Sequence, residues 1–258
     1  MSEVIINNMP PKKSREEIEA EINDNVRKRI IEPILPSVEL IQRTENMKYL
    51  IWRAARVCYS IKSMPELEQE WNETPEEKRT GLVTGLMERG HRTTYSHPNF
   101  SYVIVCSRVV SHQIVRHQVG VTIDQESQRY VPYETGFRYI QPEGVDNNIF
   151  KKLMEEAHDQ YMSLYKEYRL SGLGKRESAE LARYVLPSAI STRMVCTCSL
   201  AALIHLNNVR VQGDTGKPQG ETQVVCSSMV KLALQAEPWL KPAFEKKKKK
   251  ETQEAKAT

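Results

Sequence analysis

The sequence predicts an α/β (α+β) fold, and two patterns carry that prediction. Apolar and polar residues alternate over residues 100–106, as in a strand that buries one face. Apolar residues recur three and four positions apart over residues 46–60 and 150–170, as in helices that pack on a core. With 258 residues, 40% apolar and 27% charged, the chain is long enough for one large globular domain.

The N-terminal elements are expected to be a polar helix, a strand and a core helix. Ser14 and Glu17 have the spacing of a capping box, so a helix should start there. Because it is very polar, we treat residues 1–37 as a peripheral N-terminal helical extension. The stretch VELIQRT from Val38 then predicts a short strand, and residues 46–60 predict a core helix.

A further helix and the clearest strand come next. Thr74 is followed by Pro and two Glu, which is typical of a helix start, and Gly90 is expected to end that helix. The alternating strand of residues 100–106 follows. Ser107 can then cap another helix.

The helix after Ser107 is expected to carry polar side chains on one face. Gln113, Arg116 and His117 are spaced i, i+3 and i+4, which predicts that they lie together. Gly120 is a plausible end for this helix, and residues 128–134 should continue as extended chain.

The C-terminal half is predicted to be mostly helical. Helices are expected over residues 150–170, 175–186, 190–209 and 219–234. Residues 245–258 form a Lys-rich tail of low complexity, for which we expect disorder.

The charge balance argues against a nucleic-acid-binding surface. The chain has a net charge of +4, to which the lysines at 246–250 contribute +5 and the residues after them −1, so residues 1–245 sum to 4 − 5 + 1 = 0. A phosphate-backbone footprint needs an excess of Lys and Arg on one face. We therefore expect no nucleic-acid partner.

No membrane, metal or disulfide function is expected either. No apolar run is long enough to span a bilayer and the N-terminus lacks a signal peptide core, which favours a cytoplasmic protein. The five Cys have no CxxC spacing, so we expect buried reduced thiols and no metal site.

Residues 111–131 are unusually rich in groups that form directional hydrogen bonds: two Arg, two His and four Gln. The chain has no Gly-rich phosphate loop and no HExxH motif. Four arginines instead fall at or near helix ends, and they are Arg116, Arg129, Arg183 and Arg210. A guanidinium group suits a phosphate, a carboxylate or a pyrimidine edge, although an arginine at a helix end is often only a surface residue.

Five short stretches follow one another in an order that is specific to one family. They are AARVCYS from Ala54, GHRTTYSH from Gly90, SHQIVRH from Ser111, ARYVLP from Ala182 and LNNVR from Leu206. Together with RHQ from Arg116 and ESQRY from Glu126, they resemble the flavin-dependent thymidylate synthases. The signature of that family is Arg-His-Arg, seven residues, Ser, then Gly or Gln before Arg-Tyr. We therefore treat residues 38–244 as one domain of this type.

The resemblance implies a fold and an activity. The fold would be that of a thymidylate synthase-complementing protein, a central mixed sheet flanked by helices. The activity would be the reductive methylation of dUMP to dTMP. The family uses 5,10-methylenetetrahydrofolate as carbon donor, FAD as the hydride-transferring flavin and NADPH as the usual reductant. Members of the family form homotetramers, and the resemblance implies the same assembly for this chain.

The resemblance also implies the site residues. The family's nucleotide contacts fall on Gln113, Arg116, Ser127, Gln128, Arg129, Arg183 and Arg210. Arg210 would lie at the pyrimidine N3 edge as a catalytic group, and Ser127 would be a hydroxyl that positions the substrate. His91 would lie near the folate and the flavin ring.

The flavin-facing positions depart further from the family. The cofactor contacts would be Cys58, Thr93, Arg116, His117, Gln118, Gln125, Ser199 and His205. Gln118 replaces the second Arg of the signature, and the spacer has eight residues instead of seven. Ser199, Ala201 and His205 stand where the family often has Asn, Arg and Asn.

Two alternatives stay open at this point. One is a divergent paralogue that transfers a one-carbon unit to C5 of UMP or a cytidine nucleotide, with a methyl or hydroxymethyl product. The other is a non-enzymatic nucleotide-binding protein. The sequence does not decide which pyrimidine nucleotide is bound or whether FAD is retained.

Overall fold

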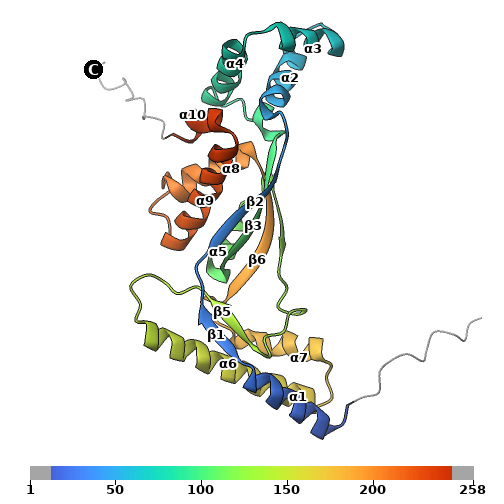
Figure 1. Ribbon diagram of the computed structural model, residues 1–258, viewed down its shortest axis with the longest axis vertical. Helices are drawn as coiled ribbons and strands as arrows, with labels where there is room; N and C mark the ends of the chain where they lie inside the picture. The colour runs from blue at the N-terminus through green and yellow to red at the C-terminus, as the bar shows by residue number, and fades with distance from the viewer. Residues whose placement is uncertain (1–12, 246–258) are drawn as a thin grey trace, which may run out of the picture. The chain divides into compact units, whose positions relative to one another are not determined.

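The computed structural model describes residues 13–245, and Figure 1 shows how they form helices and strands. The chain divides into two compact units. Unit 1 combines Met1–Leu35 with Glu126–Ser191, and unit 2 combines Pro36–Gln125 with Thr192–Thr258. Both contain sheets flanked by helices, so the predicted α/β class is confirmed. Except for Glu245, the expected Lys-rich tail lies outside the described residues.

Unit 1 is a two-stranded parallel sheet with helices packed on it. Its elements in chain order are α1 (Arg15–Arg27), β1 (Ile30–Pro33), β5 (Gly136–Tyr139), α6 (Asn147–Leu170), α7 (Lys175–Ala182) and the 3₁₀ turn η2 (Arg183–Val185). Ile30 pairs with Gly136, and Pro33 pairs with Tyr139. The core between sheet and helices is rich in aromatic rings, with Tyr161 and Tyr165 fully buried.

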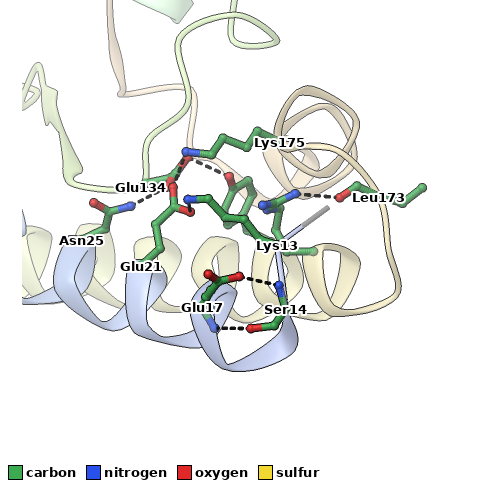
Figure 2. A network of polar contacts seen from close by, with 10 residues as sticks. Lys13, Ser14, Glu17, Glu21, Asn25, Glu134, Leu173 and Lys175 are labelled. Carbon is green, nitrogen blue, oxygen red and sulfur yellow. Dashed lines mark hydrogen bonds and ion pairs between the residues drawn. The ribbon is translucent and has the colours of Figure 1, made fainter. Parts of the chain in front are cut away.

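Helix α1 is anchored within unit 1 by polar contacts and by one apolar side chain. Figure 2 shows Lys13 and Lys175 in ion pairs with Glu21, and the Asn25 side chain donating a hydrogen bond to Glu134. Ile22 is buried in the unit 1 core. The predicted division into an extension of residues 1–37 and a domain of 38–244 stays a prediction, but the helix and strand of that extension belong to unit 1.

Unit 2 contains the larger sheet and most of the helices. Its strands are β2 (Ser37–Arg43), β3 (Asn99–Ser107), β4 (Val121–Gln125) and β6 (Ser191–Ser199), in the order β2-β3-β6-β4. Its helices and turns are α2 (Met47–Tyr59), α3 (Met64–Glu73), α4 (Glu76–Glu88), η1 (Thr94–Ser96), α5 (Arg108–Ile114), α8 (Leu200–Leu206), η3 (Asn207–Val211), α9 (Gly220–Ala236), η4 (Pro238–Leu240) and α10 (Lys241–Phe244).

One face of this sheet forms the main core. Tyr102, Cys106, Cys196 and Cys198 are fully buried on it, and the Tyr102 hydroxyl donates to the Met229 carbonyl of α9 at 3.1 Å. Strands β2 and β3 pair antiparallel, as do β4 and β6. Four cysteines are buried as expected, but the expectation is wrong for the fifth, Cys58, which is exposed.

Strands β3 and β6 end in the same way. Each has nine residues and a final serine whose side chain caps a seven-residue helix: Ser107 accepts from Val110 N, and Ser199 accepts from Ala202 N, both at 3.2 Å. The sheet therefore fixes where α5 and α8 begin.

Several sequence-based element assignments were wrong. Residues 190–209 are not one helix, because β6 precedes α8 and alternate β6 side chains are buried. Residues 128–134 are not extended, since the Tyr130 and Val131 amides donate to the Ser127 carbonyl and close a turn. Strands β1, β4 and β5 and helix α3 were not anticipated. Among the described residues, no helix combines the length and apolarity that crossing a membrane requires.

Candidate active site

Arg210 lies in a widened helical turn of unit 2. Helix α8 passes directly into the π-helical turn η3 at Asn207–Val211, a distortion that is frequent at functional sites. The Asn207 side chain donates to the Phe244 carbonyl at 3.1 Å and holds the turn against the C-terminal helix. The Arg210 Nε group donates to His117 Nε2 at 3.1 Å.

His117 is the acceptor for Arg210 and therefore must be neutral. Burial lowers the pKa of His117, and the neighbouring Arg210, His205 and Arg116 lower it further. The ring of His205 packs against the ring of His117, with centroids 5.4 Å apart and an interplanar angle of 64°. Arg210 and two of the predicted cofactor residues thus form one cluster.

Gln113 and Arg116 lie close to this cluster in sequence but do not share a helix face with His117. Helix α5 ends at Ile114, so the predicted i, i+3, i+4 face is wrong. The Gln113 side chain donates to Gln219, the residue that precedes α9. Arg116 is exposed, and no ion pair involves it within residues 13–245.

Gln125 has its amide group locked by two hydroxyls. Its Nε2 donates to Ser111 Oγ at 3.0 Å and to Thr192 Oγ1 at 3.1 Å. Ser111 in turn donates its own proton to the Arg108 carbonyl, so towards Gln125 it can only accept. Both amide protons are therefore used, and Gln125 retains its carbonyl oxygen as a free acceptor.

Gln125 also lies beside a small cavity. Gln125 lines a space of about 300 Å³ together with His117, Gln118 and the apolar side chains of Val115, Val121 and Ile123. Three predicted cofactor residues are thus brought to one cavity, which we name cavity A.

A larger cavity of about 620 Å³, cavity B, is lined by another predicted cofactor residue, His205. His205 and Ala201 line it, with Tyr95 and Trp239 as aromatic walls. Gly90 and Arg92, which flank His91, are also part of the lining. His91 and Thr93 are exposed beside it.

Two predicted cofactor residues have other settings. Ser199 is buried, and its hydroxyl caps α8. Gly120, at φ 73°, passes so close that a Cβ there would lie 2.5 Å from Ser199 Oγ. Cys58 lies near the end of α2, lines neither cavity, and contacts the Ala54 carbonyl.

The remaining predicted nucleotide residues belong to unit 1. Ser127 begins the turn that replaces the expected strand, and its Oγ accepts from Arg129 N at 3.3 Å. Arg129 forms an ion pair with Glu180 of α7 at 2.8 Å. Arg183 directly follows α7 and begins the 3₁₀ turn η2. Gln128 is buried.

Sequence reasoning missed three residues that belong to these arrangements. Glu180 holds Arg129, Gln219 holds Gln113, and Arg92 supplies a cation to cavity B. Arg92 lies within the stretch GHRTTYSH, whereas nothing local in the sequence indicated Glu180 or Gln219.

Comparisons with known proteins identify the family. The family model described as Thymidylate synthase complementing protein matches residues 39–239. The flavin-dependent thymidylate synthase of Nitratidesulfovibrio vulgaris is 29% identical over 80% of this chain and 85% of its own length. That of Clostridium tetani is 33% identical over 65% of this chain and 71% of its own.

A solved structure supports the fold. The UMP/dUMP methylase PolB from Streptomyces cacaoi, bound with 5-Br dUMP, aligns with a TM-score of 0.63 and 20% identity, over 83% of this chain and 96% of that one. The family match covers far more than half of the described chain, and the resemblance seen in the sequence is confirmed. The chain therefore belongs to the thymidylate synthase complementing protein family, that of the flavin-dependent thymidylate synthases, and is an enzyme of this family.

Proposed function

We propose that the chain catalyses the reductive methylation of dUMP to dTMP, with 5,10-methylenetetrahydrofolate as carbon donor. The donor's methylene group forms the new bond at C5 of the pyrimidine, C5 loses its proton, and tetrahydrofolate is released. FAD, reduced by NADPH, would supply the hydride that converts the methylene group to methyl.

The observation that carries this proposal is the setting of Arg210. Its guanidinium is partly buried in a distorted turn, is held through Nε by a neutral histidine, and has no carboxylate partner within residues 13–245. A fixed positive charge at the pyrimidine N3 edge would stabilise the negative charge that develops as C5 becomes nucleophilic. Arg210 would therefore be the main catalytic group of the protein.

The other nucleotide contacts would bind and orient the substrate. The residues that we propose for this role are Gln113, Arg116, Gln128, Arg129 and Arg183, whose amide and guanidinium groups can donate hydrogen bonds.

Ser127 would position the substrate through its hydroxyl. Among the described residues, that hydroxyl is bonded to the Arg129 amide, and no histidine activates it. The catalytic set that we propose is Arg210, Ser127 and His91.

The two cavities have the chemistry that a flavin requires. A planar ring system needs apolar or aromatic walls and a few polar groups at its edge. Cavity B offers Tyr95 and Trp239 as walls, and cavity A is lined by Gln125, whose carbonyl oxygen would accept from a ring N–H. Arg116 is a cation available for the diphosphate.

The cofactor set that we propose is Cys58, Thr93, Arg116, His117, Gln118, Gln125, Ser199 and His205. His91 would lie near the folate and the flavin ring. The homotetramer implied by the family and the cytoplasmic location are further parts of the proposal.

An absorbance spectrum with bound flavin tests the proposal first. The purified protein is mixed with FAD and dUMP, freed of unbound flavin, and treated with NADPH under anaerobic conditions. We expect a flavin spectrum that bleaches, and then formation of dTMP when 5,10-methylenetetrahydrofolate is added.

Turnover of UMP or dCMP in place of dUMP, or a hydroxymethyl product, would point to the divergent-paralogue alternative. A colourless protein that binds dUMP without turnover would refute the enzymatic proposal. Sedimentation velocity on the same samples tests the tetramer.

A further inference from the structure

The contact between His117 and Arg210 determines which N–H groups of Arg210 can face the nucleotide. An arginine has five N–H donors, of which Nε–H points to the side of the guanidinium and the four Nη–H groups form a fork at its end. The Nε–H of Arg210 is occupied by His117 Nε2 at 3.1 Å. Within residues 13–245 the Nη groups have no hydrogen-bond or ion-pair partner, so the fork remains to face a ligand.

We propose that His117 is a positioning residue that sets the plane of the Arg210 guanidinium, so that its fork meets the pyrimidine edge as a flat pair of donors. The role of Arg210 at that edge rests on the proposed function. The role of His117 goes beyond its expected contact with flavin.

The positions of the protons on the two side chains support this role. Because Arg210 Nε can only donate, His117 Nε2 must carry a lone pair, and its proton must lie on Nδ1. A protonated His117 would place a second N–H against Arg210 and a positive charge beside it. Half-burial and the cations Arg210 and Arg116 favour the neutral ring that the contact requires.

The surroundings hold both partners in place. The ring of His205 packs at a 64° angle against the ring of His117 and limits its rotation. The Asn207 bond to the Phe244 carbonyl fixes the turn that carries Arg210. Anchoring Nε removes part of the rotamer freedom that a long arginine side chain would otherwise lose on binding a ligand.

Two variants distinguish a positioning role of the His117 side chain from a packing role. His117→Phe keeps a ring but removes the acceptor, whereas His117→Gln keeps a carbonyl acceptor near the position of Nε2. His112→Phe is the matched control, because His112 is an exposed histidine of the neighbouring helix α5. All are made in the full chain, and circular dichroism verifies folding.

The first readout needs no ligand. In ¹⁵N NMR spectra of the wild type, we expect an unprotonated Nε2 for His117 and a slowly exchanging Nε–H signal for Arg210. The signal should be lost in His117→Phe and retained in His117→Gln and His112→Phe. A protonated His117 Nε2 in the wild type would overturn the proposal even if no variant folds.

The second readout is the dissociation constant for dUMP by calorimetry. We expect it to rise about tenfold in His117→Phe and less than about threefold in His117→Gln, as for loss and retention of one orienting hydrogen bond. Equal affinities in wild type and His117→Phe would overturn positioning. Wild-type protein that binds no dUMP would overturn the proposed function, and the Arg210 Nε–H signal would still decide the role of His117.

Discussion

Replacement of Arg129 by Ala should weaken nucleotide binding while leaving the fold almost unchanged. The side chains of Arg129 and Glu180 are 35% and 36% exposed, so their 2.8 Å ion pair is screened by solvent. Pairs of this kind contribute about 0.2–1 kcal/mol to folding. The Arg129 Nε–H, by contrast, is buried without a partner among residues 13–245, and a phosphate oxygen would satisfy it.

The expected loss of affinity follows from that phosphate contact. A hydrogen bond to a charged group contributes about 1.5–3 kcal/mol, which corresponds to a rise of roughly 10- to 150-fold in the dissociation constant for dUMP. Calorimetry with dUMP and competition with deoxyuridine, which has no phosphate, separate this contact from contacts to the base. Only the dUMP affinity should fall.

The matched control is Glu180→Gln, which removes the carboxylate and keeps Arg129. Because the ion pair is half-exposed, we expect its dUMP affinity to stay within about fivefold of the wild type. A twofold change or less in Arg129→Ala, or an equal loss for deoxyuridine and dUMP, would refute the assignment of Arg129 to the phosphate.

Three further predictions concern catalysis, pH and a glycine. Arg210→Ala should abolish dTMP formation without changing the sedimentation coefficient; an unchanged kcat would contradict the role of Arg210. His158 is fully buried and donates from Nε2 to the Tyr133 carbonyl, and burial lowers its pKa below the ordinary 6.5. The unfolded chain therefore binds more protons, and the urea midpoint should fall as the pH drops below 6.5, an effect that His158→Gln should reduce. Gly120→Ala should lower the unfolding free energy by about 2–3 kcal/mol, and Gly144→Ala by about 1 kcal/mol. Both glycines have positive φ, but only a Cβ at Gly120 would meet a neighbouring atom, Ser199 Oγ at 2.5 Å. Equal shifts in melting temperature would show that this close contact is relieved.

The sequence was sufficient where a periodic pattern was long. Helix α6 begins with a capping Asp146 and presents a regular buried stripe, and strand β3 alternates along its whole length. Strand β6 was not recognised because three of its buried positions are occupied by Met194, Cys196 and Cys198, which are not among the residues enriched in strands. Helix α3 was missed although Ser63 and Glu66 carry the capping-box spacing, and the structure forms it.

The site was predictable in its residue types but not in its pairings. Local motifs pointed to Arg210, His117 and Gln125 separately. The contact between Arg210 and His117 joins residues that are 93 positions apart in the chain, so it forms only in the folded protein. The partners of Gln125 are also distant in sequence, since its amide group donates to the hydroxyls of Ser111 and Thr192.

The altered residues at the positions proposed to face the flavin are better explained by rebuilding than by decay. In a site that is no longer under selection, buried polar groups without partners are expected to accumulate. Each such group lowers the stability by about 1–3 kcal/mol but does not impair a function that has already been lost. Within residues 13–245, no residue that lines cavity A or cavity B has a buried side-chain nitrogen or oxygen without a partner. Gln125 is held by two hydrogen bonds that fix its amide orientation, and His205, in the place of the family's Asn, packs on the histidine that holds Arg210. Two of the departures from the expected family pattern, Ser199 and His205, thus have partners in the structure, which favours an enzyme with a modified cofactor pocket over a nucleotide-binding remnant.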